Sequence, residues 1–332
     1  MPVHCEKVFA FQTTIIVQVF NMDKLNILYC FDSRFWRMAA VSMESLLSTA
    51  NPTTQLTIYC MVAPGTKGHR KIKKIIKSHK NGAKLVWREI EPSETPFATP
   101  EFSKYDPVTF YRCIPHRFFK DIDKILYLNT VTLIFHDLAE LFNMDVSSCA
   151  FGAVYDMAPI HEANNEMGAY VRDFSHRFLN ARPYYNTGVL LLNLKRMAAE
   201  ENKLFETKVP LRYPVQDLLN AAFTGKIRTL PLKYNLAPAT PIPPQFSPEE
   251  AAVVNSGGHV IVDCYYTWPY DKEHSNKLVY ETFVKYAGNI GMKPEIFAKE
   301  TDKYIPVKKT YVRHVTIRQG KIFFFGMKVD KQ

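Results

Sequence analysis

One pair of carboxylates, Asp121 and Asp123, has the spacing of a divalent-metal site, with a single residue between them. Carboxylate oxygens are the ligands that hard divalent cations prefer. The pair, however, precedes the apolar run 124–128, which is typical of a buried strand. In an open α/β sheet, ligands bind beyond the carboxyl ends of the strands, and this pair lies roughly 17 Å away at the opposite end. We therefore interpret both side chains as solvated carboxylates of a turn.

Polar side chains also fall where a ligand of such a sheet would bind. Asp32 ends the apolar run 26–31, and Asp156 ends the run 151–155. The helix predicted between them carries Arg112. Each of these side chains could instead cap a helix or satisfy a buried hydrogen bond, but polar groups at strand ends favour a site.

The alternation of apolar runs and helical periods predicts the sheet that positions these residues. Strand-length runs at 26–31, 56–62 and 84–90 alternate with helical periods at 38–49 and 67–84. Strand, helix, strand, helix, strand is the opening of a parallel, doubly wound α/β sheet, which binds nucleotides at the carboxyl ends of its strands. The later predicted elements are a loop at 91–107, helices at 109–119, 136–142 and 213–223, strands at 124–128, 151–155 and 185–194, and a proline-rich crossing at 231–244.

Composition describes an ordinary soluble globular protein, with 332 residues, 47% hydrophobic and 22% charged. This length allows one large domain or two smaller ones. The six cysteines are scattered without a close pair, which favours inert thiols in a reducing compartment and hence a cytoplasmic location. The apolar run 8–20 is too short and too polar for a comfortable membrane span. We interpret it as a dispensable extension or as the product of an upstream start codon, with a weak membrane anchor as the alternative.

The formal net charge of +10 is concentrated in two segments, 67–84 and 303–331. The first predicts an amphipathic helix with Ile72, Ile75 and Ile76 inward, and its basic side is interpreted as a solvated face. The second surrounds the apolar run 322–325 and has two interpretations: peripheral contact with anionic lipid headgroups, or a β-hairpin turning at 319–320. Neither segment has a recognisable nucleic-acid docking motif, so nucleic acid is not expected as a partner.

Several landmarks occur in the order found in glycosyltransferase family 8, which the chain resembles over about three quarters of its length, 26–270. They are NILYCFD, FYRCIP, KILYL, AVYD, YYNTGVLLLNL and QDLLNAAF. The resemblance, to galactosyltransferase- and glycogenin-like members, implies a GT-A fold. This is a Rossmann-like nucleotide-diphospho-sugar transferase fold with a mainly parallel mixed sheet flanked by helices. The expected organisation is an N-terminal extension at 1–22, a GT-A domain at 23–275 and a basic C-terminal segment at 276–332.

The same resemblance implies an activity and roles for individual residues. Relatives transfer a hexose from a nucleotide sugar, here expected to be a UDP-sugar, to a glycan, lipid-linked or protein acceptor with retention of configuration. By position, Asp32 would receive the nucleobase beside Arg34, Arg112 would point at the donor, and Asp156 would lie near the sugars. The expected catalytic residues are the amides of Asn186 and Gln216.

The positions that would hold a metal depart from the family pattern. Asn129 and Val131 stand in place of the paired carboxylates that follow the strand 124–128, and Asp263 stands in place of a histidine. Trp268 replaces a lysine, and Val215 replaces an aspartate beside Gln216. A divalent metal such as manganese would therefore lack a full set of ligands.

These departures leave two hypotheses open. The first is an active, metal-independent hexosyltransferase, in which cations of the chain neutralise the diphosphate. The available cations are Arg34, Arg112, Lys233 and His259. The second is a catalytically degenerate member, or pseudoenzyme, that binds a sugar nucleotide or glycan or partners an active enzyme.

Overall fold

The computed structural model describes residues 24–79, 81–157, 166–239, 244–264 and 269–298, and the backbone of two strands at 314–318 and 321–325. The predicted N-terminal extension at 1–22 and the apolar run 8–20 lie outside these ranges, as do 299–313, 319–320 and 326–332 of the basic C-terminal segment. Trp268 also lies outside them.

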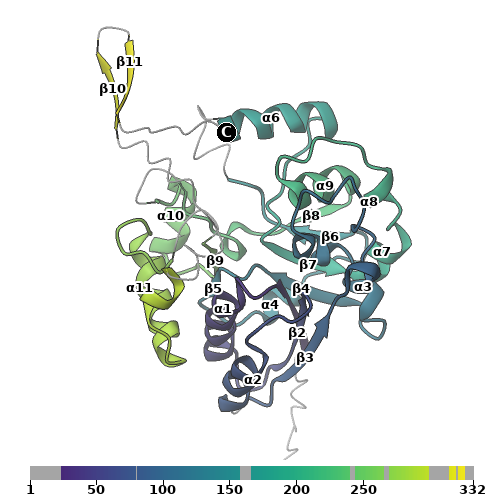
Figure 1. The fold of residues 1–332 in the computed structure, drawn as a ribbon, viewed down its shortest axis with the longest axis vertical. Coiled ribbons are helices and arrows are strands. Elements are labelled where there is room, and N and C mark those ends of the chain that lie inside the picture. The colour runs from purple at the N-terminus through teal and green to yellow at the C-terminus, as the bar shows by residue number, and fades with distance from the viewer. Residues whose placement is uncertain are drawn as a thin grey trace, which may run out of the picture.

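A seven-stranded mixed sheet forms the centre of the molecule (Figure 1), with the order β3-β2-β1-β4-β7-β6-β8. Neighbours from β3 to β4 are parallel, β7 is antiparallel to both β4 and β6, and β6 and β8 are parallel. The predicted mainly parallel mixed sheet is therefore confirmed. The strands are β1 Lys24–Phe31, β2 Gln55–Val62, β3 Lys84–Glu89, β4 Lys124–Leu128, β6 Phe151–Ala153, β7 Val189–Asn193 and β8 Ile227–Thr229.

Both faces of this sheet are buried, because successive strand side chains point to opposite faces. On β1, Ile27 and Tyr29 pack with the helices α1 (Trp36–Thr49) and α2 (His69–Ser78). Leu28 and Cys30 pack with the opposite layer. In Figure 1, α1 and α11 lie to the left of the sheet and α7 and α8 to the right. The helices are α1 Trp36–Thr49, α2 His69–Ser78, α3 Pro115–Phe118, α4 Ala139–Phe142, α6 Glu166–Phe178, α7 Leu194–Ala199, α8 Lys203–Glu206, α9 Pro214–Ala222, α10 Pro248–Asn255 and α11 Lys277–Asn289.

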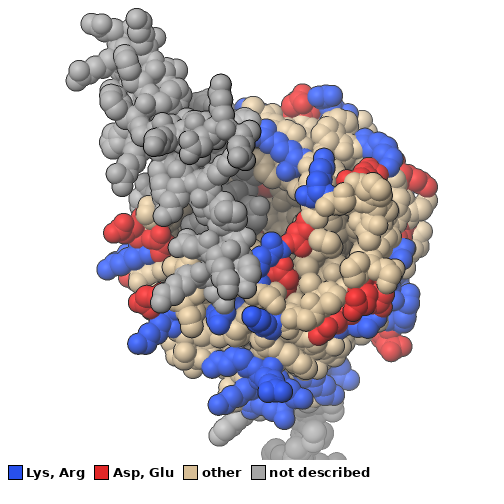
Figure 2. All heavy atoms as spheres, in the orientation of Figure 1, with Lys and Arg blue, Asp and Glu red and all other residues tan. Residues whose placement is uncertain are grey.

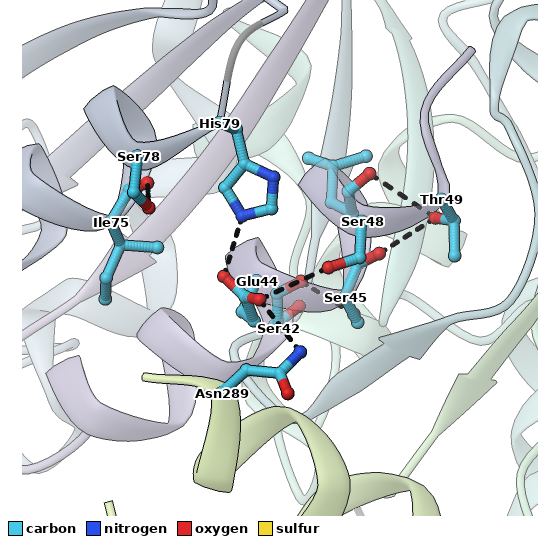
Figure 3. Close-up of polar contacts among 10 residues, drawn as sticks. Ser42, Glu44, Ser45, Ser48, Thr49, Ile75, Ser78, His79 and Asn289 are labelled. Atoms are coloured by element: carbon cyan, nitrogen blue, oxygen red, sulfur yellow. Dashed lines mark hydrogen bonds and ion pairs between the residues drawn. The ribbon is translucent and has the colours of Figure 1, made fainter. Parts of the chain in front are cut away.

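A buried carboxylate on α1, Glu44, joins three helices (Figure 3). Its two oxygens contact His79 Nε2 at the end of α2 (2.9 Å) and Asn289 Nδ2 at the end of α11 (3.1 Å). Ser48 Oγ donates a further hydrogen bond of 3.2 Å. Three polar partners offset the cost of burying this carboxylate. Helix α11 belongs to the predicted C-terminal segment 276–332. It thus packs in the same core as α1.

Two predicted helices are shorter than their apolar patterns suggested. The segment 109–119 forms a 3-10 helix, Pro107–Cys113, followed by α3, because Pro115 lacks an N–H and disfavours a helical residue before it. In the segment 136–142 only α4 is helical, with Asp137 Oδ1 accepting from Ala139 N at 2.7 Å. The apolar run before α4 forms a strand, β5 Thr132–Ile134, paired with β9 Ile261–Asp263.

The predicted strand at 185–194 begins later, at Val189, and Leu194 already starts α7. Asn186 N still donates to the backbone of Val154 (2.9 Å), but side chains accept from other backbone N–H groups before Val189. Tyr185 N donates to Asn220 Oδ1 (2.7 Å), and Gly188 N donates to Asn186 Oδ1 (2.8 Å). The backbone is therefore free to leave the sheet and form a loop at its edge.

Near the C-terminus, β10 His314–Arg318 and β11 Lys321–Phe325 pair antiparallel, which confirms the predicted hairpin. The turn itself at 319–320 lies outside the described residues. Within the described ranges, no helix is both long and apolar enough to cross a bilayer.

Candidate functional site

A cavity of about 670 Å³ opens where β1 and β4 end. Because β7 is antiparallel to β4, the loop that precedes β7 reaches the same edge of the sheet. The start of α9 contributes the remaining wall. The residues predicted from the sequence that line this cavity are Asp32, Arg34, Arg112, Asn129, Val131, Asn186, Val215, Gln216 and Asp263.

Asp32 and Arg34 are bound to each other at the end of β1. Arg34 donates to Asp32 through its backbone N (2.7 Å to Oδ1) and through Nε (2.8 Å) and Nη2 (2.5 Å) to Oδ2. Asp106 forms a second ion pair with Arg34 Nη2. Both oxygens of the carboxylate that was expected to receive a nucleobase therefore already accept hydrogen bonds. The charge of Arg34 is matched by two carboxylates.

Arg112 lies on the 3-10 helix Pro107–Cys113 and is held by neutral groups. Its Nε donates to Thr109 O (3.2 Å) and its Nη1 to Thr187 O (3.1 Å), while its guanidinium lies 4.3 Å from the ring centre of Tyr127. No carboxylate among the described residues forms an ion pair with it. A rigidly held guanidinium whose charge is not neutralised by a paired carboxylate is suited to bind phosphate oxygens in two places.

Hydrogen bonds to other protein groups hold the two predicted amides, Asn186 and Gln216, in place. Gln216 Oε1 accepts from Thr187 N (3.0 Å), and Gln216 Nε2 donates to Asp156 Oδ2 (2.6 Å). Asn186 Oδ1 accepts from Gly188 N (2.8 Å) and Asn235 Nδ2 (2.9 Å). Asp156 is buried and does not line the cavity, so the structure places it as the support of Gln216.

Gly188 allows the loop before β7 to pass close to Asp263. A Cβ at this position would overlap Asp263 Oδ2 and would lie 3.0 Å from Asn186 Oδ1. Asp263 is 1% exposed and lies opposite Thr132 in the β5–β9 pair. The glycine of the asparagine-threonine-glycine sequence is therefore sterically required, because a larger residue would displace a carboxylate of the cavity wall.

The residues at the expected metal positions do not fit a divalent cation. They supply one carboxylate, Asp263, one neutral amide, Asn129, and the aliphatic side chain of Val131. Hard cations such as manganese or magnesium need several oxygen ligands, normally with more than one carboxylate. Among the described residues, no cluster of three or more His, Cys, Asp and Glu side chains is arranged to hold a metal ion.

Sequence reasoning missed one cavity cation and misassigned two others. Arg212, just before α9, lines the cavity, with its guanidinium 5.3 Å from the ring centre of Tyr170. Lys233 instead pairs with Glu140 at 3.0 Å, and His259 packs 4.4 Å from the ring centre of Phe135. Neither lines the cavity. Arg212 follows no strand and opens no motif, so only its place ahead of the glutamine helix could have suggested it.

A buried carboxylate beside Gln216 anchors the start of α9. Asp217 is 0% exposed and accepts from Tyr184 OH (2.5 Å), Tyr170 OH (2.8 Å) and Tyr213 N (2.7 Å). Burial raises the pKa of the Asp217 carboxyl above its ordinary value of 3.8, although these hydrogen bonds oppose the shift. The network connects α6, the loop before β7 and α9.

This raised pKa predicts the pH dependence of stability. A group whose pKa is higher in the folded state binds its proton more tightly there. Its stabilising contribution to the unfolding free energy is therefore fully present below pH 3.8 and is lost as pH rises through the folded pKa. We expect the unfolding free energy of the wild type, relative to Asp217→Asn, to fall as pH rises through this window. Urea unfolding over acid pH would measure it. The exposed Asp123→Asn serves as the control, and a difference that grows with pH would contradict the prediction.

The sequence is similar to those of known proteins. The family model described as Glycosyl transferase family 8 matches residues 26–254. A putative glycosyltransferase of Haemophilus influenzae is 28% identical over 138 residues, 39% of this chain and 39% of that protein. A lipopolysaccharide 1,2-glucosyltransferase of Escherichia coli is 23% identical over 229 residues, 66% of this chain and 64% of that protein. The chain thus spans less than two thirds of the length of either relative.

Solved structures show the same architecture. The galactosyltransferase LgtC, in complex with donor and acceptor sugar analogues, superposes with a TM-score of 0.61 at 19% identity, covering 83% of this chain and 99% of that one. The bifunctional glycosyltransferase WbbM superposes with a TM-score of 0.64 at 17% identity, covering 85% of this chain and 52% of that one. At these identities the likeness concerns the fold.

Proposed function

The chain belongs to glycosyltransferase family 8 and has the GT-A fold, and we propose that it transfers a hexose from a nucleotide sugar to a sugar-bearing acceptor without a divalent metal. Transferases of this family use nucleotide-sugar donors. A cavity of about 670 Å³ is within the range of small-molecule sites. We propose a UDP-hexose as donor and a glycan or lipid-linked sugar as acceptor, the class that the lipopolysaccharide glucosyltransferase relatives are named for.

The chemistry determines what the cavity must supply. The bond between the sugar C1 and the diphosphate oxygen breaks, and its electron pair leaves with the diphosphate. An acceptor hydroxyl oxygen forms the new bond to C1, and its proton passes to the oxygen of the departing diphosphate. Negative charge therefore develops on the leaving diphosphate, and the site must stabilise it.

The observation that carries the proposal is the position of Arg112. Its guanidinium lines the cavity and contacts two backbone carbonyls and one aromatic ring, without an ion pair to a described carboxylate. Arg212 brings a second guanidinium to the same cavity. Together they can bind the diphosphate in a cavity where Asn129 and Val131 supply no anionic ligand.

The fixed amides are suited to orient the transferred sugar. Asn186 uses its carbonyl oxygen for two internal donors, so its Nδ2 hydrogens remain to donate to a sugar hydroxyl. Gln216 lines the same cavity and is held there by Asp156 Oδ2 and by Thr187 N. Groups whose orientation is already set stabilise a transition state without reorganisation at the moment of reaction.

Calorimetric titration with UDP-hexoses, followed by a transfer or donor-hydrolysis assay, tests the function. We expect one UDP-hexose to bind equally well with manganese and with a chelator, and turnover to proceed without added metal. Turnover that requires manganese would contradict the metal-independent site. Failure of every nucleotide sugar to bind would reject the donor assignment, and binding without turnover would identify a non-catalytic member.

Restoring the missing carboxylates should create metal binding. The double substitution Asn129→Asp with Val131→Asp adds two carboxylates to the cavity that already contains Asp263, which gives three oxygen-bearing acids for a cation. We expect manganese binding by calorimetry in the double variant and none in the wild type. The single variant Asn129→Asp is the matched control. Manganese binding of equal strength in the wild type would show that the present ligands suffice.

A further inference from the structure

Helix α2 carries a dense basic face on the outside of the molecule. The exposed basic side chains on and beside it are Lys67, Arg70, Lys73, Lys74, Lys77 and Lys84. The sequence from 64 to 84 contains no Asp or Glu. Figure 2 shows Lys and Arg side chains gathered at the lower end of the molecule, where Figure 1 places α2. We call this the α2 basic face.

No ion pair among the described residues neutralises the charge of helix α2 and Lys67. The ion pairs among the described residues include none made by Lys67, Arg70, Lys73, Lys74 or Lys77. Like charges this close repel one another, which disfavours the folded state. A surface of this kind is complementary to an extended negative surface.

The helix is also held so that only this face can meet a partner. Its apolar side chains, Ile72, Ile75 and Ile76, are buried in the hydrophobic core that α1 also contributes to. At its start, Gly68 has a φ of 99° and packs directly on the Trp36 ring. At its end, His79 Nε2 contacts the buried Glu44 at 2.9 Å (Figure 3). The helix therefore cannot roll to insert its isoleucines, and binding by this face is electrostatic.

We propose that the α2 basic face binds the anionic headgroups of a lipid bilayer. The charges are mainly lysines on a single convex helix, which suit a diffuse array of headgroups more than a groove of fixed geometry. No exposed aromatic side chain alternates with them to stack on bases; His69 is itself stacked on Trp87 at 4.6 Å. These features favour a membrane over nucleic acid.

The location of the face adds a consequence for the cavity. Lys67 N, just before α2, donates to Ser33 Oγ at 3.0 Å, and Ser33 lies between Asp32 and Arg34 of the cavity. A bilayer bound at α2 therefore lies next to the segment that leads into the site. The membrane contact itself does not depend on the proposed transferase activity.

Vesicle co-sedimentation of the full chain tests the proposal. The probe is phosphatidylcholine vesicles with and without phosphatidylglycerol. The variant Lys73→Gln, Lys74→Gln, Lys77→Gln should bind anionic vesicles about a hundredfold more weakly, since each basic residue near such a surface is worth about a fivefold factor. Binding of the wild type should also fall as salt is added, because the Debye length shortens.

A matched variant, Lys272→Gln, Lys285→Gln, Lys293→Gln, removes the same charge from exposed positions elsewhere and should bind nearly as the wild type does. Both variants retain the C-terminal segment, and equal melting temperatures would show that both fold. Equal binding by the two variants would overturn the proposal, as would wild-type binding to neutral vesicles alone. Retention of labelled DNA that depends on the α2 lysines, without vesicle binding, would assign the face to nucleic acid instead.

Discussion

Replacing Arg112 with alanine should lower kcat about 10²–10³-fold, the typical effect of removing one preorganised group that stabilises developing negative charge. Arg34, a cavity arginine just after β1, is matched by Asp32 and Asp106, so it cannot compensate without breaking both ion pairs. Arg112→Lys should recover only part of the activity, because lysine keeps the charge and loses the planar fork. Steady-state kinetics at saturating donor would measure both variants.

The control for Arg112 is Arg177→Ala, which removes an exposed arginine of α6 whose partner is Asp173. Its kcat should match that of the wild type. Thermal unfolding of all variants separates loss of activity from loss of the fold, since Arg112 also packs on the ring of Tyr127. A folded Arg112→Ala variant with an unchanged kcat would remove Arg112 from the mechanism.

Gly188→Ala should destabilise the protein by about 1–3 kcal/mol, the usual cost of overpacking a well-packed interior. The new Cβ would overlap the carboxylate of Asp263, which is 1% exposed and has little room to move. Relief requires shifting the loop before β7 or the strand β9, and both belong to the cavity wall. Urea unfolding would measure the stability change, and titration with donor would show the accompanying loss of affinity.

Gly288→Ala is the comparison for Gly188. It lies within α11, and no atom comes within 4 Å of the Cβ that would be added. Alanine favours a helix over glycine by about 1 kcal/mol, so this variant should be as stable as the wild type or more so. Equal stability of Gly188→Ala and the wild type would show that Asp263 moves aside at little cost.

The sequence predicted the architecture well because the sheet is buried on both faces. Uninterrupted apolar runs such as 26–31 and 124–128 read clearly as strands, and polar residues directly after them, such as Asp32, lie in the cavity as expected. Positions whose place depends on tertiary contacts were harder. Asp156 also follows a strand, yet its side chain accepts a hydrogen bond from Gln216 and does not line the cavity.

Loop cations and helix breaks were the least predictable. Arg212 reaches the cavity from a loop. Lys233 and His259, which the sequence offered as cations for the site, instead contact Glu140 and Phe135. The expected helix at 109–119 is divided at Pro115, although a periodic apolar pattern continues through it. Local patterns carry no information about which distant side chain will take a polar group as its partner.

The pairing of β5 with β9 brings Thr132 opposite Asp263, far apart along the chain. The stretch that matches the family model ends at residue 254, before Asp263 is reached. Domains generally fold as units during synthesis, so the binding site should be completed only after β9 has left the ribosome. A fragment that stops at the family boundary would have the scaffold without a finished site.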